Sequence, residues 1–79
     1  MKLLEVQPGE QVKVTGFEGG KGLQTKLTQH GIYPGDCLRL LRKAPLGGPL
    51  LVEVNQRELA LGRGVAAKII VEAIPCESL

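Results

Sequence analysis

Aromatic residues are scarce in this chain: its 79 residues include no Trp, one Phe and one Tyr. Proteins that bind RNA or single-stranded DNA commonly stack bases on aromatic side chains, so the shortage argues against a nucleic-acid partner. Charge argues the same way, because 10 Lys and Arg against 8 Asp and Glu leave a net charge of only +2, and the basic residues are scattered. We expect Phe17 in the core and Tyr33, between Ile32 and Pro34, at the surface.

Long apolar runs are also missing. No stretch approaches the roughly 18 residues of a membrane span, and the first apolar residues run straight into Glu5, so we expect neither a transmembrane helix nor a secretory signal. The two cysteines, Cys37 and Cys76, are fewer than a small secreted domain normally uses, which predicts reduced thiols. These absences together predict a soluble cytoplasmic protein.

Side chains for catalysis are few. The chain has one His, one Asp and one Ser, at His30, Asp36 and Ser78, and Ser78 is the penultimate residue, poorly placed for a Ser–His–Asp site. The run Gly19–Gly22 ends like a phosphate-binding loop, but it lacks the earlier Gly and the Ser or Thr after Lys that such a loop requires. A chain this short also has little room for a deep pocket, so we expect no catalytic site and no enzyme.

Candidate metal ligands are isolated in the sequence. His30, Cys37 and Cys76 are the candidates, and none belongs to the closely spaced Cys or His pairs that mark a zinc site. We therefore predict no required metal or other cofactor, and at most an adventitious or regulatory divalent ion. A small metal-sensing module, in which the fold collects these three residues, stays open as an alternative function.

Alternating apolar and polar residues predict short β-strands. The first is built on Val12 and Val14, which follow the Pro8–Gly9 turn signal. In the second predicted strand, Leu41 breaks the alternation of apolar and polar residues. The other strands are predicted at Cys37–Lys43, Leu50–Val54, Arg57–Leu61 and Lys68–Ile74, with a helical turn at Val65–Ala67 after a tight turn at Leu61–Gly64. The expected aliphatic core is Val12, Val14, Leu38, Leu40, Val52, Val54, Leu59, Leu61, Ile69 and Val71.

A two-residue turn at Asn55-Gln56 joins two of these strands. The register that this turn dictates places Glu53 opposite Glu58 on the outer face, where like charges repel. Either Arg39 on the neighbouring strand screens the pair, or the register differs by one residue.

One short helix is predicted between the first and second strands. Leu23, Leu27 and His30 fall at i, i+4 and i+7, Gly31 suits a left-handed C-terminal cap, and Pro34 follows. A helix of about eight residues is too short to be stable alone, so it must dock through its leucines. We expect one domain over residues 1–79, with its core at about 3–74 and a short C-terminal tail. The fold class is mostly β, a small five-stranded barrel with this helix.

The order of these segments resembles the FeoA family, the ferrous iron transport protein A family, which has an SH3-like barrel fold. The family usually has a leucine where His30 stands and commonly an arginine where Lys26 stands, so the chain departs from it there. The matching segments are Pro8-Gly9, Val12–Phe17, Lys26-Leu27, Gly31–Gly35, Ala44–Pro49, Leu59–Ala66 and Lys68–Val71.

The resemblance implies a cytoplasmic accessory protein of ferrous iron uptake. Its expected partner is the cytosolic GTP-binding domain of a FeoB-type iron permease, through which alone it would meet the membrane; a homodimer stays open. Exposed loops are expected at Gly19–Gly22, Pro45–Pro49 and Arg63-Gly64. The candidate partner-binding residues are Lys21, Lys26, Tyr33, Pro45, Leu46, Gly47 and Arg63. A KOW-like barrel that binds RNA or the ribosome is the competing interpretation, because Gly9–Val14 followed by Gly16 has a similar cadence.

Overall fold

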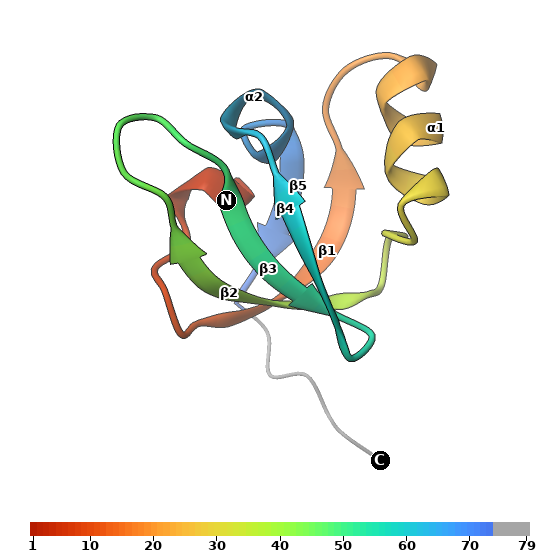
Figure 1. Ribbon diagram of the computed structural model, residues 1–79. Helices are drawn as coiled ribbons and strands as arrows, with labels where there is room; N and C mark the ends of the chain where they lie inside the picture. Colours follow the sequence, from red (N-terminus) through yellow and green to blue (C-terminus); the bar gives the residue numbers. More distant parts are fainter. Residues whose placement is uncertain (74–79) are drawn as a thin grey trace.

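A curved antiparallel sheet of five strands forms the body of the computed structural model, which describes residues 1–73 (Figure 1). The strand order is β4-β3-β2-β1-β5. The mostly β fold with one short helix between the first two strands is confirmed. The elements in chain order are η1 (Leu3–Glu5), β1 (Gln11–Phe17), α1 (Lys21–Gln29), β2 (Cys37–Lys43), β3 (Leu50–Val54), β4 (Arg57–Leu61), α2 (Arg63–Ala66) and β5 (Ile69–Glu72).

The core lies on the concave face of the sheet, where the period-2 alternation places the aliphatic residues. Every predicted core residue is buried except Leu59, which is half-buried and packs against the others. Phe17 also packs against the core while half-buried. The sequence pattern missed Leu3, Val6 and Ile32, all of which are fully buried.

Two β-bulges bend the sheet. Leu41 is the extra residue of the first, because Leu40 pairs with Val52 while Arg42 pairs with Leu51; the break in alternation at Leu41 thus has a structural cause. The second bulge, in β1, leaves Thr15 unpaired in the ladder. A bulge increases the local twist of a strand, so the two together curl the sheet toward a barrel.

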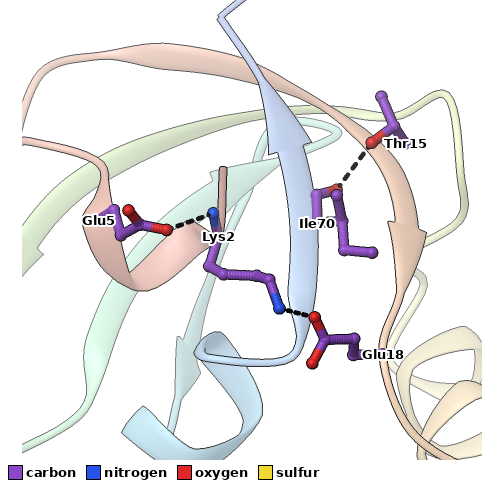
Figure 2. Close-up of polar contacts among 5 residues, drawn as sticks. All are labelled: Lys2, Glu5, Thr15, Glu18 and Ile70. Carbon is purple, nitrogen blue, oxygen red and sulfur yellow. Dashed lines mark hydrogen bonds and ion pairs between the residues drawn. The ribbon is translucent and has the colours of Figure 1, made fainter.

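The outer edge of β5 is covered by the start of the chain. Val71 donates its N–H to the carbonyl of Met1 at 2.8 Å, and Lys2 forms a bridge with Ile70. Figure 2 shows the Lys2 ammonium paired with Glu18 and the Lys2 N–H bonded to a carboxylate oxygen of Glu5. Within residues 1–73 the ladder order is linear, so the barrel-like curl is achieved without pairing between β4 and β5.

Three predicted boundaries are wrong. The last strand is Ile69–Glu72, shorter than 68–74, because Lys68 donates its N–H to Val65 and still belongs to the turn after α2; Ile74 lies outside the described residues. The expected turn at 61–64 is reduced to Gly62, the extended N-cap of α2, because Leu61 still belongs to β4 and α2 begins at Arg63. The first helix begins at Lys21, ahead of Leu23.

The β3–β4 register is confirmed, including the like-charge pair that it places on the outer face. Val54 pairs with Arg57 across the two-residue turn, and Glu53 lies opposite Glu58. On its other side Glu53 lies opposite Arg39 of β2. Arg39 and Glu53 are thus a favourable cross-strand pair of opposite charge, whereas Glu53 and Glu58 are an unfavourable pair of like charge. No helix within residues 1–73 is long and apolar enough to cross a bilayer.

Candidate partner-binding surfaces

The loop between β2 and β3, residues 44–49, projects from one side of the sheet (Figure 1). It closes on itself, because Ala44 donates its N–H to Pro49 at 2.9 Å and Gly48 donates to Pro45 at 3.1 Å. The tip residues Leu46 and Gly47 have φ of 58° and 76°. We call residues 44–49 the β2–β3 loop.

Arg63, the first residue of α2, holds the base of this loop. Its Nε donates to the carbonyl of Gly48 at 3.1 Å, and its Nη2 donates to the carbonyl of Ala44 at 3.2 Å. The rigid fork of a guanidinium suits two such acceptors. Lys43 adds a second tie, since its ammonium donates to the carbonyl of Leu4 at 2.9 Å. The base of the loop is therefore fixed, while its tip is exposed.

Leu46 is the unusual residue at that tip. A left-handed backbone costs a non-glycine residue roughly 1–2 kcal/mol, and a bulky side chain there is an outlier. The Leu46 side chain is fully exposed, with a relative exposure of 103%. It therefore recovers none of this cost through burial among residues 1–73.

A second surface is the groove between α1 and the β4–α2 connection, a cavity of about 240 Å³ that we call the α1 groove. Leu27, the one buried residue of α1, and Leu61 form its floor. Lys26 and His30 are exposed on its rim. Figure 1 shows α1 standing beside the sheet, on the opposite side of α2 from the β2–β3 loop. The lining residues include two bases and no acid.

The end of α1 is fixed by a Schellman motif. Ile32 donates its N–H to Leu27 at 3.0 Å and Gly31 donates to Thr28 at 3.0 Å. Gly31 has φ of 85°, which confirms the predicted left-handed cap. An Arg57 Nη2 donates to the carbonyl of His30, so close to Gly31 that an added Cβ would lie 1.8 Å from that nitrogen. The first residue of β4 thus adds one hydrogen bond to a helix end that the Schellman motif defines.

The structure divides the predicted partner-binding residues into two groups. Pro45, Leu46 and Gly47 lie in the β2–β3 loop, and Arg63 points into the base of that loop. The other three accompany α1. Lys21 is exposed at its start, Lys26 is exposed on the groove rim, and Tyr33 is 52% exposed in the turn that follows it.

Sequence reasoning missed the far wall of the α1 groove. Leu61 was expected in the core, and the short helical turn gave no sign of facing α1. The groove exists because α1 lies beside the β4–α2 connection, and no period or motif in the sequence encodes that arrangement. The residues missed there are Ala60, Gly62 and Val65, beside Leu61 of the floor.

A third hollow, of about 330 Å³, crosses the outer face of β1, β2 and β3. Its charged residues Arg39 and Glu53 are cross-strand neighbours, so their charges oppose each other. The other lining residues are Gln11, Cys37, Asn55 and Gln56. The hollow therefore carries no net charge among its lining residues.

Residues 1–73 contain no group of three or more His, Cys, Asp or Glu side chains arranged to hold a metal ion. His30 ends α1 and Cys37 begins β2. Cys37 is disulfide-bonded, so the expectation of a reduced thiol is wrong for this residue, and the bond occupies its sulfur. Cys76 and Ser78 lie outside the described residues. That no metal or cofactor is required stays a prediction.

The open, curled five-stranded sheet with one helix after its first strand places the chain in the class of small SH3-like β domains. The FeoA domain model matches residues 1–73, and the chain belongs to the FeoA family. This confirms the resemblance seen in the sequence.

Three known proteins show how far the similarity extends. A Methanocaldococcus jannaschii protein named Fe(2+) transport protein A is 36% identical over 64 residues, covering 81% of this chain and 76% of the relative. A Porphyromonas gingivalis Fe(2+) transport protein A/Fe(2+) transporter FeoB fusion protein is 30% identical over 74 residues, which cover 94% of this chain and 9% of the fusion. The solution structure of a FeoA-like protein from Clostridium acetobutylicum superposes with a TM-score of 0.86 at 28% identity, covering 100% of this chain and 92% of the other.

Proposed function

We propose that this protein is a cytoplasmic accessory protein of Fe2+ uptake that acts by contact with the cytosolic GTP-binding domain of a FeoB-type permease. The observation that carries the proposal is the P. gingivalis relative, in which a segment matching 94% of this chain belongs to one polypeptide with FeoB. Fusion keeps two partners at a high effective concentration, and separate chains must achieve the same association through a surface.

The described surfaces support a binding role over a catalytic one. The β2–β3 loop is held rigidly by Arg63 and exposes an apolar side chain. The α1 groove combines an apolar floor with a basic rim. Both suit contact with another protein, and neither brings together a nucleophile and a base within residues 1–73.

The direct test measures binding of the chain to the FeoB-type transporter of its own organism, reconstituted in lipid nanodiscs, by biolayer interferometry. We expect saturable binding that empty nanodiscs do not reproduce. Deletion of the gene should lower Fe2+ uptake, and the intact gene should restore it. Absence of binding together with unchanged uptake would contradict the proposal.

A further inference from the structure

We infer that Leu46 is the anchor of that contact: it inserts into an apolar pocket on the soluble part of the FeoB-type transporter, and Arg63 is the residue that positions it. The identity of the partner rests on the proposed function. The role of Leu46 rests on three features of the β2–β3 loop, namely its backbone conformation, its rigidity and its charge pattern.

The backbone conformation of Leu46 is one that folding alone would not select. At φ of 58° with a fully exposed side chain, Gly or Asn would be more stable at this position. Strained residues of this kind are concentrated at binding sites, where the strain is offset by the interaction made there. Burial of the leucine side chain in a partner supplies such an offset.

The rigidity of the loop makes Leu46 a prepared anchor. Two backbone bonds close the loop, and the two Arg63 donors fix both carbonyls at its base. A loop whose backbone is already ordered loses less conformational entropy on association than one that must fold on binding. The geometry thus favours a single well-placed contact over a loop that folds on binding.

The charge pattern indicates the chemistry of the pocket. Residues 44–52 carry no charged side chain, Arg42 and Lys43 directly precede the loop in the sequence, and Arg63 lies against its base. Lys43 and Arg63 already donate to backbone carbonyls, so the loop is not a phosphate site. Clusters of four to eight free bases mark lipid-binding segments, and this loop has fewer. The complementary surface is an apolar pocket with an acidic rim on a protein.

The first test compares three variants with wild type for binding to the transporter in nanodiscs and for thermal unfolding. Leu46→Asn keeps a residue that tolerates positive φ but removes the apolar side chain, so it should unfold at the same or a higher temperature and bind about tenfold weaker or more. Leu46→Met should stay within about threefold of wild type. Gln56→Gly, at the other positive-φ turn, is the matched control and should bind as wild type does.

Arg63 is tested as a positioning residue. Arg63→Lys keeps the charge but cannot make the forked contact, so binding should weaken by about threefold or more. In the double variant with Leu46→Asn no further loss should follow, because the two residues act through one contact. Additive losses would show that Arg63 contributes separately and would overturn its positioning role.

Several outcomes overturn the anchor. If wild type and Leu46→Asn bind the transporter equally well, the inference is refuted and the proposed function stays intact. Absence of binding by wild type refutes the proposed function itself. If wild type binds empty nanodiscs as well as it binds nanodiscs with the transporter, and Leu46→Asn loses that binding, the contact is with lipid instead. A dimer in analytical ultracentrifugation that Leu46→Asn converts to monomer would identify self-association instead.

Discussion

The two ends of β3 carry two connections with the same backbone signature and opposite chemistry. The β2–β3 loop has positive φ at Leu46 and Gly47, and the β3–β4 turn has positive φ at Asn55 and Gln56. Two successive positive φ angles are typical of a type I′ turn, which favours Asn followed by Gly. The β2–β3 loop therefore has the favoured residue only in its second position, Gly47, and the β3–β4 turn has it only in its first, Asn55.

The difference lies in what holds each connection in place. The β3–β4 turn follows from local chemistry, because Asn tolerates positive φ and Val54 pairs directly with Arg57. The β2–β3 loop instead depends on Arg63, which reaches it from α2. Arg57, just after the turn, does the reverse and supports α1 through His30. The strand that follows the β3–β4 turn supports α1. The β2–β3 loop is itself supported by Arg63 of α2 and exposes the side chain of Leu46.

The largest effect on stability is expected from Gly31→Ala, which breaks the support given by Arg57. The new Cβ would overlap Arg57 Nη2 and place alanine at positive φ, so we expect a loss of about 2–3 kcal/mol from strain and the lost hydrogen bond. Urea unfolding measures it. Arg57→Ala loses the hydrogen bond alone, about 1 kcal/mol, so equal losses in the two variants would contradict this account.

Next in size is the contrast between two adjacent glycines of the β2–β3 loop. A Cβ on Gly48 would lie 2.7 Å from the Cβ of Ala44 and 3.2 Å from the carbonyl oxygen of Pro45, whereas one on Gly47 would meet nothing within 4 Å. We expect Gly48→Ala to cost about 2 kcal/mol through overlap and Gly47→Ala about 1 kcal/mol through its positive φ alone. Urea unfolding of both variants measures the order, and the reverse order would show that overlap does not govern the loop.

Features that depend on neighbours along the chain were predictable from the sequence. The alternation at Leu38 and Leu40 gave a strand and its break at Leu41 coincides with a bulge. Gly31 predicted the left-handed cap at the end of α1. The turn at Asn55-Gln56 gave the register, including the Glu53–Glu58 pair.

Features that depend on distant segments were not predictable. The fork from Arg63 to the β2–β3 loop requires α2 to begin beside Ala44, which no local pattern specifies. Leu3 and Val6 enter the core from a segment too short to show a period. For the same reason the sequence could suggest Leu46 as an exposed contact, but it could not reveal the positive φ of Leu46 or the Arg63 hydrogen bonds that hold its loop.

A smaller loss of stability is expected from Arg63→Lys, which tests whether the β2–β3 loop needs its two hydrogen bonds from Arg63. Lysine cannot replace both donors to the half-buried contacts, so we expect a loss of about 1 kcal/mol, or about 4–8 °C in Tm for a domain of this size. Amide hydrogen exchange localises the effect. The N–H groups of Ala44 and Gly48 should exchange faster, and that of Arg57 at the other connection should not. Uniform acceleration at both would contradict the assignment of this support to one loop.

The smallest effect is expected from Gln56→Gly, and its sign is opposite to the others. Glycine relieves the positive φ of 66° at Gln56 and completes the Asn-Gly pair that a type I′ turn prefers, while the greater freedom of glycine in the unfolded chain removes part of that gain. A net stabilisation of about 0.5 kcal/mol should raise Tm by about 2–4 °C. Leu46→Gly, the same relief in the β2–β3 loop, should give a similar gain. A loss in that variant would show that the leucine contributes to the stability of its own chain, and the two connections would then differ less than their chemistry suggests.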